Sequence, residues 1–330
     1  MKKSLAFVLG GGGARGAMQV GALRALLEAG LRPDLLVGTS IGAANAAGLA
    51  LWGLDATGLQ RLEQVYEKIA STGIMDPQLA LFILTSLSKR PNLRSSRRIR
   101  EFLVSEGLTP ELRFNQFHDV RLAMVGADLH TGEPVIYGRD PEQSVLDGVM
   151  ASTAIPPWFA PVDLNGRCIV DGGAVSNLPI EAAVELGANT IIALDLQEPG
   201  DWNAADYSPT WYLSKLAKAS SQRETALELA LARSRGISVH HISLQSSPPV
   251  PIWDFASHRG LLQVGYELAS KEILRWREVV PARSLLPFLQ VGRSDDAAVE
   301  RKKSDGLMAL RVSLLNKRLT LWKHREPMEK

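Results

Sequence analysis

An α/β fold is predicted from three features of this sequence. Two short apolar runs, Leu5–Leu9 and residues 35–37, each lead into a glycine-containing turn and then a helical pattern. Two later apolar runs, residues 189–194 and 237–244, also have the length and composition of buried strands. The chain has 330 residues, of which 45% are hydrophobic and 22% charged, so it can form one large domain or one domain with appendages.

The first predicted strand ends in a glycine loop at residues 10–16, with the sequence GGGGARG. A helix is predicted next, with apolar residues from Val20 to Leu27 on one face and its end at Gly30. This order of strand, glycine loop and helix offers backbone N–H groups to an anion.

The same loop fits the dinucleotide-binding pattern G-x-G-x-x-G at Gly11, Gly13 and Gly16. Asp34 follows at about the distance at which that pattern places an acid. The acid belongs at the end of the second strand, however, whereas Asp34 precedes that strand, and no Gly-Lys-Ser/Thr sequence closes the loop. A nucleotide-binding regulatory or redox protein that uses this loop is therefore one alternative function.

The second predicted strand turns sharply at residues 38–42, GTSIG, into a helix of small residues at 41–52. G-x-S-x-G is typical of a nucleophile elbow, which holds a serine in a tight turn with its hydroxyl clear of the sheet. Gly38 and Gly42 are expected where neighbouring backbone leaves no room for a side chain. The helix carries no charge, so we predict that it is buried, with Ser40 at its positive N-terminal end. The structural alternative is a plain strand-to-helix turn with a capping serine.

The middle of the chain combines a helical excursion with further strands. Residues 53–118 form the excursion, which is either a lid or a packing element. Residues 120–125 and 134–137 are predicted to extend the sheet. Beyond them, residues 197–235 contain an aromatic-bearing connection and a long helix, and residues 253–277 resume a helical pattern.

A third motif follows a rigid apolar loop at residues 151–161. A strand there closes at Asp171, and Gly172 and Gly173 come directly after it. The carboxylate is thus presented at a bend that another backbone or a substrate can approach closely. An ordinary Asp-Gly-Gly surface turn is the alternative interpretation.

The last residues form a basic tail. Residues 301–330 carry nine lysines and arginines against three acidic residues, a net charge of 9 minus 3, or +6. Their central part has the apolar spacing of an amphipathic helix, which can lie on an anionic bilayer or pack on its own domain. We therefore expect a candidate catalytic domain over residues 5–200, its α/β continuation with a helical and aromatic insertion over 201–299, and this tail over 300–330.

Composition limits the partners and the compartment. The net charge of the whole chain is only +2, from 37 basic and 35 acidic residues, which does not favour nucleic-acid binding. The lone Cys168 excludes an intrachain disulfide and a cysteine-based metal site. No apolar run approaches the roughly 20 residues that span a bilayer, and the apolar start is too short for a signal peptide. We expect a cytoplasmic protein, with any membrane association peripheral.

The glycine loop, the serine elbow and the Asp-Gly-Gly turn, in this order, resemble the patatin-like phospholipase family. Weaker support comes from residues 151–161 and from Asn177-Leu178-Pro179, and the resemblance covers roughly the first 200 residues. It implies a modified α/β-hydrolase fold of three layers, α/β/α, with a mainly parallel central sheet. It also implies hydrolysis of lipid acyl esters by a serine–aspartate dyad, without metal or cofactor. The oligomeric state is left open.

Transferred residue by residue, the resemblance makes Ser40 the nucleophile and Asp171 the base. The backbone N–H groups of Gly11, Gly12 and Gly13 become the oxyanion hole. The elbow and supporting residues are Arg15, Gly16, Gly38, Gly42, Gly172 and Gly173. The Arg15 side chain either attracts an anionic headgroup or forms a structural salt bridge.

A histidine that completes a triad is the alternative to this dyad, because a conventional hydrolase triad runs in the order serine, acid, histidine. His240, His241, His258 and His324 all follow Asp171 in the chain. None lies in a glycine-flanked loop, so we predict a dyad that needs no histidine. A catalytically silent, membrane-docking scaffold of the same fold is the second alternative.

Overall fold

The computed structural model describes residues 4–74, 93–156, 158–197 and 209–279. All of these residues fall within one compact unit, Met1–Gln290. The apolar stretch of the helical excursion near residues 79–84 and the basic tail at 300–330 lie outside the described residues.

An eight-stranded sheet forms the centre of the fold, in the order β5-β6-β3-β2-β1-β7-β8, with β4 paired to β3. The strands are β1 (Leu5–Leu9), β2 (Leu35–Thr39), β3 (Arg121–Asp128), β4 (Pro134–Tyr137), β5 (Val162–Leu164), β6 (Arg167–Asp171), β7 (Thr190–Leu196) and β8 (Ser238–Leu244). The pairs among β3, β2, β1, β7 and β8 are parallel. The β4 and β6 strands are antiparallel to β3, and β5 is antiparallel to β6.

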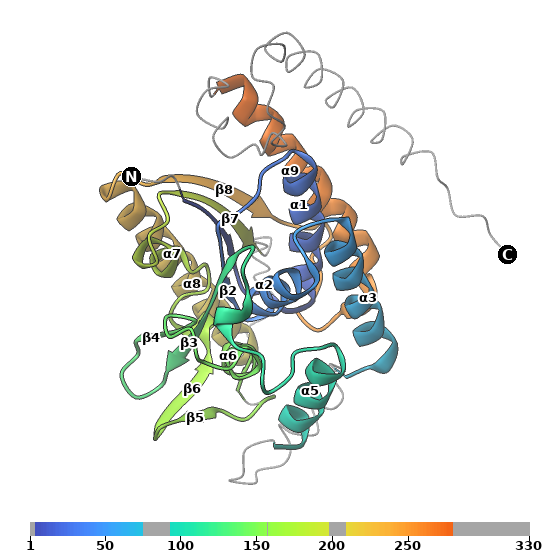
Figure 1. The fold of residues 1–330 in the computed structure, drawn as a ribbon, viewed down its shortest axis with the longest axis vertical. Helices are drawn as coiled ribbons and strands as arrows, with labels where there is room; N and C mark the ends of the chain where they lie inside the picture. The colour runs from blue at the N-terminus through green and yellow to red at the C-terminus, as the bar shows by residue number, and fades with distance from the viewer. Residues whose placement is uncertain (1–3, 75–92, 157, 198–208, 280–330) are drawn as a thin grey trace, which may run out of the picture. The chain divides into compact units, whose positions relative to one another are not determined.

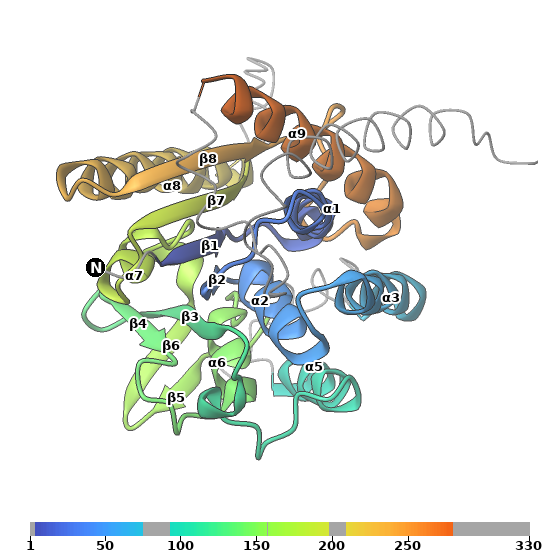
Figure 2. The same ribbon diagram turned by 45° about the horizontal axis from the view of Figure 1, so that its top comes forward.

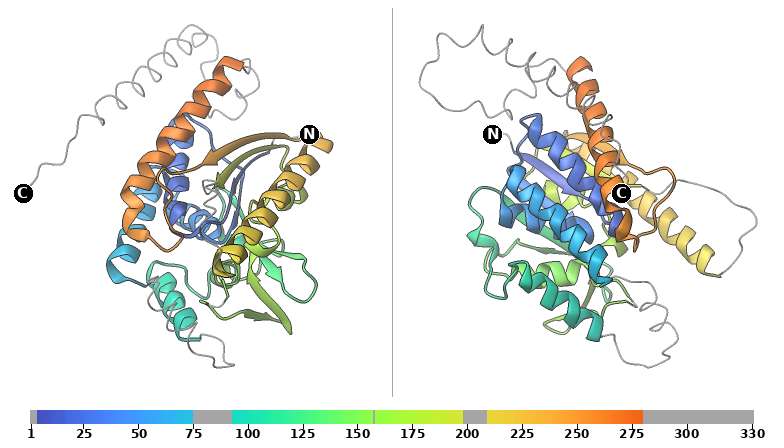
Figure 3. Two further views of the ribbon diagram at one scale, coloured as in Figure 1. Left: turned by 180° about the vertical axis from the view of Figure 1, so that it is seen from behind. Right: turned by 90° about the vertical axis from the view of Figure 1, so that its right-hand side faces the viewer.

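Helices cover both faces of the sheet, which gives the predicted three layers (Figures 1 and 2). They are α1 (Gly16–Glu28), α2 (Ile41–Trp52), α3 (Ala56–Thr72), α5 (Leu93–Ser105), α6 (Val145–Ser152), α7 (Ile180–Glu185), α8 (Pro209–Ser234) and α9 (His258–Val279). Side chains alternate along β1: Phe7 and Leu9 pack in the core with α1, α2 and α9, whereas Ala6 and Val8 pack in the core with α7 and α8. The views from behind and from the side separate the same two helical layers (Figure 3).

Two predicted segments differ from the structure in detail. The apolar loop predicted at residues 151–161 begins inside a helix, because α6 runs to Ser152 after an N-cap in which the Ser144 side chain accepts from the Asp147 N–H. The helical pattern predicted from residue 253 starts later, since a 3-10 turn at Phe255–Ser257 precedes α9. The short elements α7 and β5 were not predicted at all.

Strand register gathers the three sequence motifs at one edge of the sheet. Leu9 of β1 pairs with Gly38 of β2, so the glycine loop and the elbow leave neighbouring strands at the same level. On the other side of β2, Thr39 pairs with Val125 of β3. The next residue of β3, Gly126, pairs with Asp171. Asp171 is therefore brought level with the elbow by a strand that runs in the opposite direction.

Candidate active site

The elbow at Ser40 has the strained backbone that its sequence predicts. Ser40 adopts φ 56° and ψ −127°, a region that residues other than glycine rarely occupy. A Cβ atom on Gly38 would lie 2.4 Å from the Gly42 carbonyl oxygen, and one on Gly42 would lie 2.2 Å from the Leu9 carbonyl oxygen. The expectation that backbone crowds both glycines is confirmed.

A second serine, Ser152 at the end of α6, supports the elbow. The Ser40 N–H donates to Ser152 Oγ at 2.9 Å, and the Ser152 hydroxyl donates to the Val125 carbonyl at 2.6 Å. Both side chains are buried. Ser152 thus joins the strained turn to the middle of β3, a role that sequence reasoning missed.

Asp171 presents a buried carboxyl beside Ser40. Its Oδ1 accepts from the Gly173 N–H at 2.8 Å, while Oδ2 is buried and has no hydrogen-bond partner among the described residues. Burial raises the pKa of Asp171 to about 6, and the Ser40 hydroxyl and the Gly173 N–H limit this rise because they favour the ionised form. Gly172 and Gly173 begin a 3-10 turn that starts at the carboxyl end of β6.

The glycine loop is fixed by hydrogen bonds on both flanks. The Gly10 N–H donates to the Leu194 carbonyl at 3.1 Å, the Gly11 N–H to the Asn177 carbonyl at 3.0 Å, and the Ala14 N–H to the Ile252 carbonyl at 2.6 Å. Among the described residues, the N–H groups of Gly12 and Gly13 have no such acceptor. Of the three predicted oxyanion-hole amides, that of Gly11 is therefore already occupied.

The remaining predicted loop residues have structural contacts. Arg15 is buried, and its Nε donates to the Gly12 carbonyl at 3.2 Å. Gly16 begins α1 and faces α2 and α3, where a Cβ atom would lie 2.5 Å from both the Ile41 side chain and the Tyr66 hydroxyl. The Arg15 side chain thus stabilises the conformation of the glycine loop.

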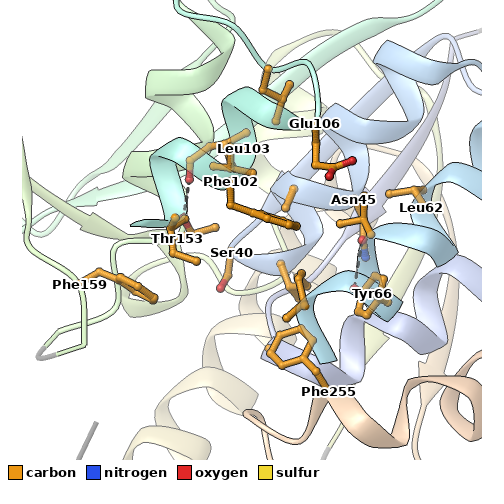
Figure 4. A pocket seen from close by; sticks show the side chains of 18 of the residues that line it. Ser40, Asn45, Leu62, Tyr66, Phe102, Leu103, Glu106, Thr153, Phe159 and Phe255 are labelled. Atoms are coloured by element: carbon orange, nitrogen blue, oxygen red, sulfur yellow. Dashed lines mark hydrogen bonds between the residues drawn. The ribbon is translucent and has the colours of Figure 1, made fainter. Parts of the chain in front are cut away.

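An apolar cavity of about 110 Å³ lies against Ser40 (Figure 4). Its wall is formed mainly by α2, α3, α5 and the residues after α6, and Figure 4 shows Ser40 between Phe159 and Thr153 on one side and Tyr66 and Phe255 on the other. The polar Asn45 in this wall is satisfied, since it accepts from the Tyr66 hydroxyl at 3.1 Å and donates to Gln19 at 3.0 Å. The cavity thus offers a hydrocarbon chain an apolar environment beside a hydroxyl group.

The three described histidines that follow Asp171 in the chain have partners other than Ser40 and Asp171. His240 packs its ring on Trp276 at a centroid distance of 4.6 Å. His241 Nε2 lies 2.9 Å from Asp195 Oδ2, and His258 Nδ1 lies 2.8 Å from the Phe255 carbonyl oxygen. His324 lies outside the described residues. That catalysis needs no histidine stays a prediction.

Asp34 is in the wrong place for a dinucleotide-binding acid. Its Oδ2 accepts from the Leu5 N–H at 2.8 Å, so the carboxylate lies at the amino end of β1. The glycine loop leaves the carboxyl end of the same strand, about 15 Å away at the rise of an extended chain. This position weighs against the nucleotide alternative.

Fold and site together define a class: a three-layer α/β protein whose candidate serine–aspartate pair lies at the carboxyl edge of the central strands. The family model described as patatin-like phospholipase matches residues 7–184. That span contains the glycine loop, the elbow and the Asp-Gly-Gly turn, and the chain belongs to this family.

Relatives with curated names agree. The chain is 28% identical to human patatin-like phospholipase domain-containing protein 6 over 296 residues, which cover 83% of the chain and 20% of that protein. It is 31% identical over 244 residues to protein 7 of the same series from Mus musculus, covering 70% of the chain and 17% of that protein. The chain thus spans about a fifth of the length of these relatives. An uncharacterised NTE family protein of Mycobacterium bovis is 34% identical over 195 residues, covering 59% of the chain and 30% of that protein.

Solved structures with a similar fold include VipD from Legionella pneumophila, with a TM-score of 0.43 and 14% identity, covering 98% of the chain and 76% of VipD. The structure of the ExoU–SpcU complex from Pseudomonas aeruginosa has a TM-score of 0.40 and 15% identity. The match covers 83% of the present chain and 52% of the solved chain. Across the described part of the sequence, no helix has the length and apolar character needed to cross a membrane.

Proposed function

We propose that the chain hydrolyses acyl ester bonds in lipids, in the manner of a phospholipase A or a lysophospholipase, by means of a Ser40–Asp171 dyad. One observation carries this proposal: Ser40 lies in the wall of an apolar cavity, and its hydroxyl is one of the groups that lower the pKa of the buried Asp171 carboxyl. Ser40 also stands at the N-terminus of α2, whose positive end favours a developing negative charge.

In the first step, Ser40 Oγ forms a bond to the ester carbonyl carbon while Asp171 Oδ2 accepts the hydroxyl proton. The carbonyl π electrons move to its oxygen, and this oxyanion accepts hydrogen bonds from the amides of Gly12 and Gly13. In comparable sites such donors contribute roughly 3 to 4 kcal/mol each. The Gly11 amide supports the loop instead, because its N–H already donates to the Asn177 carbonyl.

In the second step, the carbonyl re-forms, the bond to the alcohol breaks, and the leaving oxygen takes the proton from Asp171. A water molecule then attacks the acyl-Ser40 carbonyl, and Asp171 accepts its proton. Collapse of the second tetrahedral intermediate releases the fatty acid, and the proton returns to Ser40 Oγ. A pKa of about 6 makes Asp171 a stronger base than an ordinary aspartate while leaving it ionised at neutral pH.

The test is labelling by a fluorophosphonate probe, followed by hydrolysis of a short-chain nitrophenyl ester. We expect the probe to modify Ser40, and Ser40→Ala and Asp171→Asn each to lower kcat at least about a thousandfold. The double variant should be hardly worse than either single one, because the two residues act as a unit.

Retention of most activity by either single variant, with normal melting, would contradict the dyad. Stabilisation of the protein by NAD or ATP, together with an absence of fluorophosphonate labelling, would favour the nucleotide-binding alternative. Absence of labelling and of any hydrolysis of lipid esters would instead leave the silent scaffold.

A further inference from the structure

Two carboxylates of α8, Glu224 and Glu228, lie against the connection between β6 and α7. Glu228 is 6% exposed; its Oε1 accepts from the Ser176 hydroxyl at 2.6 Å, and its Oε2 accepts from the Glu181 N–H at 2.8 Å. The Asn177 N–H lowers the pKa of Glu224, whose buried Oε1 has no hydrogen-bond partner among the described residues. The α8 helix therefore lies against Ser176 and Asn177 of the connection and against Glu181 in the first turn of α7.

The same connection also holds the glycine loop and the elbow. The Asn177 carbonyl accepts from the Gly11 N–H at 3.0 Å, and the Ser176 carbonyl accepts from Thr39 Oγ1 at 2.8 Å. Gly11 precedes the amides proposed for the oxyanion hole, and Thr39 precedes Ser40. Glu224 and Glu228 thus support both the glycine loop after β1 and the elbow after β2, and they do so through residues 176–177.

Crowding makes this support tight. A Cβ atom on Gly11 would lie 2.5 Å from Asn177 Oδ1 and 3.1 Å from Ser40 Cβ, so the loop, the connection and the nucleophile are in direct contact. A shift of residues 176–177 is therefore transmitted to the loop and the elbow together. In a serine hydrolase site, a misplacement of about 1 Å costs on the order of a hundredfold in rate.

We propose that Glu228, together with Glu224, is a positioning residue that sets the Gly12 and Gly13 amides against Ser40 by way of Ser176 and Asn177. This inference rests on the proposed function, since it assigns a task to the same site. The residues touch no reacting atom; they act only through the connection.

Electrostatics give this support a pH dependence. Among the described residues, the charged side chains that raise these two pKa values are acidic: Glu228 and Glu181 act on Glu224, and Glu181 acts on Glu228. Burial raises the pKa of Glu224 and of Glu228, each to about 7, and the charge of Glu228 raises that of Glu224 further. The hydrogen bonds that the two carboxyls accept lower these pKa values, since they favour the ionised form, but burial outweighs them. The folded protein therefore loses stability as pH rises from the ordinary 4.5 through about 7.

The experiment compares Glu228→Ala, Glu228→Gln and Glu224→Gln with a matched control, Glu181→Gln, which removes the third acid but leaves the Glu181 backbone N–H in place. We expect Glu228→Ala to lower kcat and the rate of Ser40 modification about tenfold to a hundredfold, with KM within about twofold. Glu228→Gln keeps an acceptor and mimics the protonated acid, so it should restore activity to within about threefold and flatten the change in kcat between pH 6.5 and 8.5.

A second measurement does not depend on activity. Hydrogen exchange of the Gly11 amide should accelerate at least about tenfold in Glu228→Ala and remain at the wild-type rate in Glu181→Gln. Wild-type kcat and wild-type exchange in Glu228→Ala would overturn the inference. If that variant fails to fold, wild-type pH dependence and wild-type exchange in the Glu224→Gln/Glu228→Gln double variant would overturn it instead.

If the proposed function is wrong, the wild-type protein is not modified at Ser40. The exchange rate of the Gly11 amide then still decides whether Glu228 supports the glycine loop. If the wild type is modified and active while Glu228→Ala is indistinguishable from it in both measurements, the positioning role alone is wrong.

Discussion

Ser40 and Asp171 each lower the stability of the fold that holds them. The positive φ of Ser40 costs on the order of 1 to 3 kcal/mol in a residue other than glycine. Asp171 is 8% exposed, and its raised pKa means that the folded chain resists its ionisation. Both costs are expected of a site arranged for chemistry, where reactivity takes precedence over stability.

We therefore predict that Asp171→Asn stabilises the protein at high pH. The folded pKa of about 6 lies above the ordinary 3.8, so the wild type loses stability as pH rises toward and through 6, and the neutral asparagine does not. The expected gain in the free energy of unfolding is up to about 3 kcal/mol at pH 8 and close to zero at pH 4. Urea denaturation at both pH values measures it.

The control for this measurement is Asp119→Asn, which removes an exposed aspartate in a loop away from the site. It gives the effect of removing an exposed carboxylate at the same two pH values. A pH-independent difference between Asp171→Asn and the wild type would mean that Asp171 is not held in a pKa-raising environment.

At the residue scale, sequence reasoning located what has a local signature. Ser40 and Asp171 are each followed closely by glycine, and that pattern marks a tight turn wherever it occurs. Ser152 and Glu228 have none, because their partners lie 112 and 52 residues away in the chain. An ordinary serine at a helix end and an acid in a long helix become recognisable only when the fold brings their partners to them.

The α2 helix has two tasks, since it carries Ser40 at its start and contributes to the cavity wall one turn later. Ala44 lies in that wall, and its small side chain leaves part of the space beside the nucleophile open. The residues opposite come from α3 and α5 and are largely apolar. Under the proposed function, side-chain volume on α2 should therefore set the length of acyl chain that this cavity accepts.

We predict that Ala44→Leu shifts the preference toward short chains. The larger side chain fills part of a cavity of about 110 Å³, so the ratio of kcat/KM for a long-chain ester over an acetate ester should fall about tenfold or more. A panel of nitrophenyl esters of increasing length measures the ratio. Ala50→Leu, on the same helix but outside the cavity lining, should leave it unchanged, and an unaltered profile in Ala44→Leu would exclude this cavity as the acyl site.

At the element scale, the long and strongly patterned segments were predicted correctly. The β1 and β2 strands and α2 appear where the apolar runs placed them, because buried parallel strands and a charge-free helix have few alternatives. The misses are short elements: β5 has three residues and α7 six, too few for a periodic pattern. Strand order and the antiparallel direction of β6 depend on long-range pairing, which one sequence does not encode locally.

At the scale of the whole molecule, the proposed function requires access to a lipid ester within a bilayer or micelle. The described part of the chain has no membrane-crossing helix. Residues 301–330, outside the described part, carry the net charge of +6. That this tail keeps the protein at an anionic surface stays a proposal of the sequence.

Truncation after Val299 tests it. The shortened protein should sediment less with anionic liposomes and act more slowly on vesicles, yet hydrolyse a soluble monomeric ester at the wild-type rate. The liposome difference should shrink at high salt, because basic residues near a charged surface act within a Debye length. Equal liposome binding, or loss of both activities through unfolding, would favour a tail that packs on its own domain.

The pairing of Gly126 with Asp171 has a practical consequence for anyone who refolds or redesigns this protein. Side chains alternate along a strand, so a slip of one position between β3 and β6 would turn the carboxylate to the opposite side of the sheet. Such a chain could keep much of its helix content and compactness and yet be inert. Turnover per mole of protein would then report the fraction of molecules with correctly aligned strands, a quantity that bulk spectroscopy would overlook.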